Sequence, residues 1–583
     1  MTGTGRRAVL FGLCATFVVV GGGNLPAVQP IPLGRAQPPA GVSAPHLDAI
    51  EAKLREVSPG LRGSVWQRTA GNQLAGAPND ASGWLLQNPG CWGDAKCAAR
   101  PGTERLLARM LANISHATRT VDISSLGPFP DGRFHETIVA GLQAATAGGK
   151  KLAVRILMGN PVPLGTKLKI GPAAYRDTLV ESLGAAAADI DLNVGEMASD
   201  DPGLSWNHSK LLVVDGESVI AGGINDWAGD YLDAPDPVID VDLAVNGPAA
   251  GIAGRFLDSL WAWTCDHRGP GTGSSASGPA SGSADSAPGV TAGSSGGSSG
   301  FGPSVGYSSV ATANGADCFP RLEDDRNPMP AEVSGGVPVI AVGGLGNSLA
   351  LADKSSDYNP RPPDAAAAGC IAGVNIWHDY SNADRNYDTV NPDSTAQREL
   401  VASAREHIEI SQQDLIGPCP AFSRYDVRLF DVLAAKMVQG VKVRIVVSDP
   451  ANHFPPGGYS NIGSLAEVSN ALLQRLELRT GGKDSARSAL CRNLQLASIR
   501  AADTPKWANG KAYRQHTKLI AVDGAAFYIG SKNLYPAWLQ EYGLIVEDTA
   551  AAGRLDTELL GPQWKYSRAA ASVDYATGNC PRF

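Results

Sequence analysis

A six-point pattern, His-x-Lys-x4-Asp-x6-Gly-[Gly/Ser]-x-Asn, occurs twice in this chain. The first copy comprises His208, Lys210, Asp215, Gly222, Gly223 and Asn225, and the second comprises His516, Lys518, Asp523, Gly530, Ser531 and Asn533. A single His-x-Lys on a strand is usually part of a solvated surface. Here two of the nine histidines share the whole pattern. The repetition predicts one active site built from two related halves.

The sequence before each motif repeats as well. The first half predicts a helix over 103–117 with Thr103 as its N-cap, a strand over 120–125, a helix through 138–145 and a strand over 152–157. The second half predicts a helix over 396–406, a strand over 407–411, a helix through 428–438 and a strand over 441–447. This order is typical of α/β proteins with buried, largely parallel strands.

Each motif is predicted to lie on a β-hairpin. The β-rich runs 210–215 and 518–523 end in Asp-Gly turns at Gly216 and Gly524, and the return strands cover 218–221 and 526–529. Residues i and i+2 of a strand point the same way, which places each His and Lys on one face. We expect the glycines of the Gly-[Gly/Ser] pairs to let backbone N–H groups approach a phosphate.

The N-terminus and the middle of the chain differ in composition from the two halves that carry the motifs. Arg6 and Arg7 precede an apolar run over 8–20, which predicts a secretory signal peptide over 1–36 and is too short for a membrane span. Residues 269–303 are mostly Gly, Ser, Ala and Pro, so we expect a flexible linker over 269–335. The two halves then cover 44–268 and 336–583.

Eight cysteines remain after removal of the predicted signal peptide, and an even number in an exported protein favours disulfides. Zinc is the alternative, but no pair of C-x2-C motifs with suitably spaced histidines is present. The pairings that we expect are Cys91–Cys97, Cys265–Cys318 and Cys419–Cys491, with Cys370–Cys580 left by elimination; the sequence does not prove any of them.

The chemistry that the motif residues suit is attack on a phosphodiester without a metal. Its anionic oxygens repel nucleophiles, and Lys210, Lys518, Asn225 and Asn533 could neutralise and orient them. One imidazole must be neutral to attack phosphorus and the other protonated to supply a proton to the leaving oxygen.

Each imidazole also needs an acceptor that fixes its tautomer. Asp240 and Glu541 occupy equivalent positions before an apolar strand, with Asp242 as the alternative to Asp240. Both carboxylates could instead be ordinary surface charges. Asp215 and Asp523 are grouped with the catalytic residues as part of the motif, although they suit bracing of the lysines or turns better than substrate contact.

These motifs resemble the paired HKD motifs of the phospholipase D superfamily. The segments Ser205-Trp-Asn-His-Ser-Lys210, Gly530-Ser-Lys-Asn-Leu-Tyr-Pro536 and His407-Ile-Glu-Ile-Ser-Gln-Gln-Asp414 are similar to those of secreted actinomycete phospholipases D, and the resemblance extends from about 46 to 580. The Gly/Ser-rich stretch is longer than expected in that group. The resemblance implies an α/β fold of two similar α/β/α sandwich halves, related by a pseudo-twofold axis with the active site between them.

The resemblance also implies a function. His208 would be the nucleophile and His516 the general acid, converting phosphatidylcholine to phosphatidic acid and choline through a phosphohistidine, with transfer to primary alcohols. The expected enzyme is a secreted monomer that needs no cofactor or metal, binds phospholipid at a membrane or micelle surface, and uses water or an alcohol as acceptor. We further expect Trp227, Tyr231 and Tyr459 to face the choline through cation–π attraction, with purely structural aromatics as the alternative.

Three other functions are weighed against this one. A phosphatidyltransferase of the cardiolipin or phosphatidylserine synthase type usually carries membrane spans, and none is predicted after the signal peptide. A nuclease or related phosphodiesterase is disfavoured by the formal net charge of −8, which also argues against nucleic acid as a partner. A lipid-surface binding protein with a dead site is disfavoured because every catalytic residue type is present.

Overall fold

The computed structural model describes the residues 44–74, 83–160, 170–197, 206–268, 308–313, 318–322, 336–346, 388–416, 425–448, 459, 463–535 and 539–581. The predicted signal peptide, 1–36, lies outside these ranges. Within them, no helix is both long and apolar enough to cross a lipid bilayer.

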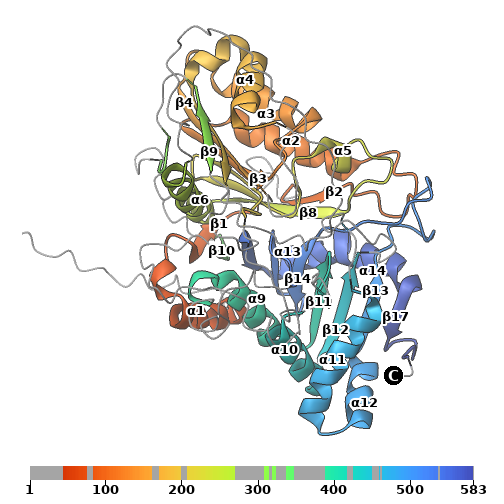
Figure 1. Ribbon diagram of the computed structural model, residues 1–583. Coiled ribbons are helices and arrows are strands. Elements are labelled where there is room, and N and C mark those ends of the chain that lie inside the picture. Colours follow the sequence, from red (N-terminus) through yellow and green to blue (C-terminus); the bar gives the residue numbers. More distant parts are fainter. Residues whose placement is uncertain are drawn as a thin grey trace, which may run out of the picture. The chain divides into compact units, whose positions relative to one another are not determined.

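The first motif lies in a mixed sheet of the N-terminal half (Figure 1). Its described strands are β2 (Leu85–Asn88), β3 (Thr120–Leu126), β4 (Leu152–Gly159), β5 (Ile190–Met197), β6 (Leu211–Val214), β7 (Ser218–Gly222), β8 (Asp240–Asn246) and β9 (Ser309–Thr312). They are ordered β2-β8-β7-β6-β3-β4-β5-β9. The neighbours β3, β4 and β5 run parallel, and the other pairs are antiparallel.

The second motif lies in a larger mixed sheet. Its strands are β1 (Trp66–Asn72), β10 (Val337–Leu345), β11 (His407–Gln412), β12 (Lys442–Val447), β13 (Leu494–Ser498), β14 (Lys518–Val522), β15 (Ala526–Gly530), β16 (Gln540–Glu547) and β17 (Ala571–Asp574). In the described part of the chain their order is β1-β10-β16-β15-β14-β11-β12-β13-β17. Here β11, β12 and β13 are the parallel neighbours.

The two sheets are therefore copies of one design. Reading β10 to β17 against β2 to β9 gives the same spatial order, and corresponding pairs have the same direction. Strand β1 is an addition at the edge of the second sheet, where it pairs with β10. The chain is thus an α/β protein with a duplicated fold, as the repeated sequence pattern predicted.

Helices cover the sheets of both halves. The N-terminal half has α2 (Pro101–Ser115), α3 (Gly132–Ala145), α4 (Pro172–Leu183), the short α5 (Ala228–Tyr231) and α6 (Pro248–Asp266). The C-terminal sheet is packed by α1 (Pro45–Val57), α9 (Pro392–Ser403), α10 (Val427–Val438), α11 (Leu465–Thr480), α12 (Lys483–Asn493), α13 (Thr549–Leu555) and α14 (Gly561–Ser567). Short 3-10 or π turns are η1 (Pro59–Leu61), η3 (Gly184–Asp189), η5 (Asp556–Leu560) and η6 (Arg568–Ala570).

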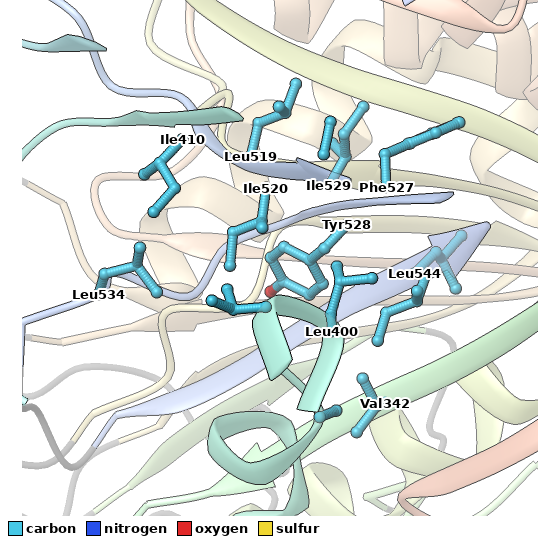
Figure 2. Close-up of a cluster of buried hydrophobic side chains, with 14 of the residues drawn as sticks. Val342, Leu400, Ile410, Leu519, Ile520, Phe527, Tyr528, Ile529, Leu534 and Leu544 are labelled. Carbon is cyan, nitrogen blue, oxygen red and sulfur yellow. The ribbon is translucent and has the colours of Figure 1, made fainter. Parts of the chain in front are cut away.

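Alternation along the motif strands separates two layers of core. In β6, Leu212 and Val214 pack into the cluster under α2, α3 and α4, whereas Leu211 and Val213 pack into a cluster shared with the C-terminal half. Figure 2 shows part of the shared cluster, where β14, β15 and β16 contribute side chains beside Leu400 of α9. Because both halves contribute to this core, burial of apolar surface fixes the motif strands against each other.

The helices and strands predicted before the motifs are all present, with ends that differ by a few residues. Three expectations differ from the structure. Helix α2 begins at Pro101 rather than after Thr103, whose hydroxyl donates to Asn88 instead. The segment 45–72, assigned to the first half, forms α1 and β1 on the second sheet because β10 offers an open edge. Part of the predicted linker forms β9, which pairs with β5.

Two of the expected disulfides are confirmed, and two pairings are wrong. Cys91–Cys97 and Cys265–Cys318 are present. Cys491 pairs with Cys580 instead, because α12 leads into β13, which pairs with the C-terminal strand β17 and brings the two Cα atoms to 5.6 Å. That bond excludes Cys419–Cys491 and Cys370–Cys580; Cys370 and Cys419 themselves lie outside the described residues.

Removal of the Phe527 ring should destabilise the junction of the halves. Phe527 in β15 is fully buried and stacks on Trp84, which precedes β2, with ring centroids 5.4 Å apart. We expect Phe527→Ala to lower the free energy of unfolding by about 3–5 kcal/mol, measured by denaturant unfolding. Val438→Ala, at a side chain 49% exposed, is the control and should change it little. An unchanged Phe527→Ala midpoint would contradict this packing.

Candidate active site

The two motif histidines lie where the halves meet, and their backbones are held by equivalent hydrogen bonds. The N–H of His208 donates to the carbonyl of Gln540 at 2.8 Å, and the N–H of His516 donates to the carbonyl of Ile239 at 2.8 Å. In each case the motif histidine donates to the residue that precedes the candidate carboxylate of the other half. This reciprocal exchange is the signature of a pseudo-twofold relation at the site.

Each imidazole is oriented by a carboxylate from the opposite half. Nδ1 of His208 lies 2.9 and 3.1 Å from the two carboxylate oxygens of Glu541. Nδ1 of His516 lies 2.9 Å from Oδ2 of Asp240, and the Gly223 carbonyl and Tyr231 hydroxyl are also in reach. Sequence spacing identified both carboxylates but did not reveal that they are exchanged between halves.

The exchange leaves Nε2 of each ring free of these contacts. A Nδ1–H donated to a carboxylate keeps the Nε2 lone pair available in a neutral ring. The ring centroids of His208 and His516 are 6.2 Å apart and the ring planes are inclined at 78°. The two rings can therefore contact one small ligand group, such as a phosphate, from different sides.

The motif lysines are buried beside the histidines. Nζ of Lys210 donates to the His208 carbonyl at 2.7 Å, and Nζ of Lys518 donates to the His516 carbonyl at 2.5 Å. Burial lowers the pKa of Lys210 to about 8 and the pKa of Lys518 well below its ordinary value, although nearby carboxylates oppose this. An anion placed between these two lysines would favour their ammonium forms.

Burial also shifts the pKa values of the two histidines and of Glu541. Burial, and then the charges of Lys210 and Lys518, hold the pKa of His208 well below its usual range. Burial and Lys518 lower the pKa of His516 to about 3 despite Asp240. Burial raises the pKa of Glu541 to about 7, against the charges of Lys532 and Lys210. A phosphate at this place would raise the pKa of each imidazole.

The two motif asparagines offer unused polar atoms. Both side-chain polar atoms of Asn533, and Oδ1 of Asn225, are buried without a hydrogen-bond partner. The amide nitrogen of Asn225 lies 3.5 Å from the Tyr231 hydroxyl. Buried amides are normally satisfied, so these atoms suit contacts to a polar ligand.

The motif aspartates lie away from the histidines, in the turns at the far ends of strands β6 and β14. Asp215 and Asp523 have φ angles of 55° and 54°, and the glycine that follows each is also left-handed. Asp215 accepts hydrogen bonds from the backbone N–H groups of 118, 119 and 120, and Asp523 from those of 405, 406 and 407. They hold each turn against the start of the neighbouring strand, β3 for Asp215 and β11 for Asp523. They do not join the group of candidate catalytic side chains.

The Gly-[Gly/Ser] pairs are in the site for a different reason from the one expected. The N–H of Gly223 donates to the Val241 carbonyl and that of Ser531 to the Tyr542 carbonyl, so neither is directed to a ligand. A Cβ at Gly223 would lie 2.3 Å from an oxygen of Asp240. At the equivalent place the Ser531 hydroxyl donates to Glu541 at 2.5 Å. These small residues give the carboxylates room.

The other members of the pairs are also packed closely. A Cβ at Gly222 would meet an oxygen of Asp242 at 2.1 Å, and one at Gly530 would meet the Tyr528 hydroxyl at 2.3 Å. Asp242 accepts from the N–H of Ile224 rather than from His516. Burial raises its pKa well above the ordinary value. Asp240 is therefore the orienting carboxylate, not the alternative that the sequence left open.

The three candidate headgroup aromatics form one cluster against His516. The Tyr459 ring is edge-on to the His516 ring at 5.0 Å and lies 5.9 Å from Tyr231 and 6.4 Å from Trp227. The Tyr231 hydroxyl also donates to Asp240 at 3.0 Å. An aromatic surface thus adjoins the His516 side of the site.

Comparison with known proteins identifies the family. The chain is 53% identical over 540 residues to a protein of Streptomyces antibioticus named phospholipase D, covering 92% of this chain and 90% of that protein. The chain belongs to the phospholipase D family.

Other comparisons add little to this membership of the phospholipase D family. No protein-family model matches the chain. Among solved structures, a phosphatidylserine synthase of Haemophilus influenzae Rd KW20 is 11% identical with a TM-score of 0.47, covering 90% of this chain and 92% of that one. A polyphosphate kinase of Porphyromonas gingivalis is 10% identical with a TM-score of 0.33, covering 81% and 49%. Both scores are too low to support a conclusion.

Sequence reasoning missed three ionisable residues near the site, of which Lys532 and Asp393 are buried and Asp226 is partly buried. Lys532 lies between Ser531 and Asn533 and forms an ion pair with Asp393 of α9, with Nζ 3.4 Å from Oδ2. Asp226, next to Asn225, has a pKa raised to about 7 by burial, against the charge of Lys210. A charged residue inside a buried return segment is the signal that could have revealed Lys532.

Asp523→Asn should affect stability rather than chemistry. Burial raises the pKa of Asp523 and its three backbone N–H donors lower it, with a net lowering, so the ionised carboxylate stabilises the fold above its unfolded pKa. We expect the substitution to cost about 1–3 kcal/mol of unfolding free energy at pH 7, with turnover by the folded fraction unchanged. The cost should shrink as pH falls below 4. Lost turnover in a fully folded variant would contradict the bracing role.

Binding of a non-titrating anion should take up protons. At pH 8 a lysine with a pKa of about 8 is half protonated, and sulfate in the site would raise the pKa of Lys210 and of the neighbouring imidazoles. We expect uptake of about half a proton from Lys210 alone, plus smaller contributions. Calorimetric titration with sulfate in Tris and in HEPES measures it, with Lys210→Met as the reduced-uptake control. Proton release would contradict this electrostatic description.

Proposed function

We propose that this chain is a phospholipase D that converts phosphatidylcholine and related glycerophospholipids to phosphatidic acid and the free headgroup alcohol. The observation that carries the proposal is the exchange of orienting carboxylates, Glu541 to His208 and Asp240 to His516, beside two buried lysines. Membership of the phospholipase D family supports the same activity. No metal or cofactor takes part in the proposed steps.

The first step forms a covalent phosphatidyl-enzyme. The Nε2 lone pair of His208 attacks phosphorus, and the bond between phosphorus and the headgroup oxygen breaks. Nε2–H of His516 gives its proton to that oxygen, so choline leaves as a neutral hydroxyl compound apart from its fixed ammonium charge. Lys210, Lys518 and the two asparagines stabilise the phosphoryl oxygens as charge develops on them.

The second step regenerates the enzyme. Neutral His516 accepts a proton from water as the water oxygen attacks phosphorus, and the bond from phosphorus to Nε2 of His208 breaks. The products are phosphatidic acid and the starting form of both rings. A primary alcohol can replace water, since it supplies the same proton and an oxygen nucleophile, and a new phosphatidyl ester is then formed.

The proposed position of the headgroup determines which histidine is the general acid and which is the nucleophile. A leaving group must be next to its acid, and the cluster of Trp227, Tyr231 and Tyr459 adjoins His516. Aromatic faces attract a quaternary ammonium by about 0.5–2 kcal/mol per ring. Choline bound there has its oxygen near His516, which leaves His208 as the nucleophile.

The disulfides and the proposed activity indicate where the enzyme acts and what it binds. The Cys91–Cys97, Cys265–Cys318 and Cys491–Cys580 disulfides suit an oxidising compartment, which supports a secreted enzyme. Its substrate is then a phospholipid in a membrane or micelle surface, with water or a primary alcohol as acceptor. We propose that it acts as a monomer, since one chain supplies both motifs.

Choline release from phosphatidylcholine vesicles in EDTA, with ethanol present, tests the proposal. Wild type should release choline and form phosphatidylethanol, and His208→Ala should lose both by at least a factor of about 10³. His516→Ala should keep measurable formation of the adduct when the leaving group is p-nitrophenol, which needs no proton.

The possible failures of this test differ. Release that EDTA abolishes would contradict the metal-free mechanism. Wild type that binds the vesicles without releasing choline would favour a lipid-surface binding protein. Choline release without phosphatidylethanol would count against a phosphatidyl-enzyme open to alcohols.

A further inference from the structure

The two halves of the site differ in charge at equivalent positions. Lys532 stands between Ser531 and Asn533, where the first half has Ile224 between Gly223 and Asn225. Asp393 follows the proline that begins α9, where α2 has a glycine, Gly102, after its first proline. The C-terminal half therefore contains a buried ion pair where the N-terminal half has an isoleucine and a glycine.

This ion pair is enclosed in the protein. Nζ of Lys532 lies 3.4 Å from Oδ2 of Asp393, and the two side chains are 7% and 0% exposed. Removing charges from water is costly, and a buried pair often stabilises a fold no better than apolar residues of similar volume. At the equivalent positions the first half has the uncharged residues Ile224 and Gly102. Stability alone thus gives no reason for the pair.

The ion pair lies beside the carboxylate that orients His208. Gly344 of β10 is directly opposite Glu541 of β16, and a Cβ at Gly344 would lie 2.6 Å from an oxygen of Asp393. The carboxylate of Asp393 thus occupies the space left open by a glycine next to Glu541. The residue before Lys532, Ser531, donates its hydroxyl to the same Glu541.

The corresponding place in the first half is neutral. Asn88 of β2 is opposite Asp240 of β8, and its Oδ1 accepts from the hydroxyl of Thr103 at 2.7 Å. Its amide nitrogen donates to the carbonyls of Tyr231 and Val238. The carboxylate that orients His516 therefore has an amide as its neighbour where Glu541 has the ion pair.

We propose that Lys532, held by Asp393, is a positioning residue that makes a nearly symmetric site directional, by keeping His208 unprotonated and hence the nucleophile. The inference rests on the proposed function, because it concerns which ring attacks phosphorus. A positive charge beside one imidazole disfavours its protonated form. Beside His516 the carboxylate of Asp240 has the opposite effect.

The three lysines around His208 act in the same direction, and the carboxylate of Glu541 opposes them. The lysines are Lys210 just before β6, Lys518 of β14 and Lys532 between β15 and β16. Burial is the largest cause that lowers the pKa of His208, followed by Lys210, Lys518 and Lys532. For His516 the charges of Lys518 and Lys210 lower the pKa, and the carboxylate of Asp240 raises it.

The test is the pH dependence of kcat/KM for phosphatidyl-p-nitrophenol, whose leaving group needs no general acid. The ascending limb then reports deprotonation of the nucleophile. We expect Lys532→Ile, and Asp393→Gly with Lys532→Ile, to move this limb upward by roughly one pH unit. Lys532→Arg keeps the charge and should retain the wild-type limb. Ile224→Val, at the equivalent position, should leave it unmoved.

A second readout is the site of covalent modification. Wild type quenched with denaturant at mildly alkaline pH should carry the phosphatidyl adduct on His208. The double variant, which has the neutral residues of the other half, should divide the adduct between His208 and His516. Peptide mass spectrometry measures the ratio. The double variant removes both members of the ion pair, so it remains informative where Lys532→Ile alone is poorly folded.

The outcomes separate this inference from the proposed function. Wild type without any histidine adduct and without choline release would overturn the proposed function itself. A wild-type adduct on His208, with an unmoved limb and an unchanged adduct in the double variant, would overturn the role of Lys532 alone. A limb moved equally by Lys532→Arg would show that packing, not charge, is responsible.

Discussion

The site depends on the hydrogen bonds by which each half orients the imidazole of the other. Glu541 holds His208 and Asp240 holds His516, and the backbone bonds of Gln540 and Ile239 fix the distance between the motifs. Within the described residues, each motif histidine has its orienting carboxylate in the opposite half. Correct docking of the halves is therefore a condition for chemistry, and the shared apolar core under β6 and β15 supplies it.

Burial gives these groups their reactivity. The enclosed lysines and histidines are held away from their charged forms until an anion arrives, so substrate binding and protonation are linked. In the proposed mechanism, the negative charge of a bound phosphodiester raises the pKa of His516 and so favours the protonated ring that acts as general acid. The amide nitrogen of Asn533 has no hydrogen-bond partner, and in the proposed mechanism it donates to a phosphoryl oxygen.

Sequence patterns predicted the duplicated fold and the paired residues because strand alternation and spacing are local properties. The partners across the halves are not local: the exchange of Asp240 and Glu541 depends on how two sheets dock, and Cys491 pairs with Cys580 through the contact of β13 with β17. The glycines were predicted to bind phosphate, yet Gly223 serves to make room for Asp240. Lys532 was overlooked since it has no counterpart in the first motif.

Selective ¹⁵N-histidine NMR of the imidazole rings tests the exchanged carboxylates most directly. The account predicts that both rings carry their proton on Nδ1 in wild type, and that Glu541→Gln alters the Nδ1 signal of His208 while Asp240→Asn alters that of His516. Assignment by His208→Gln and His516→Gln makes the comparison unambiguous. If Glu541→Gln perturbs His516 and leaves His208 unchanged, each half serves its own histidine and the account is wrong.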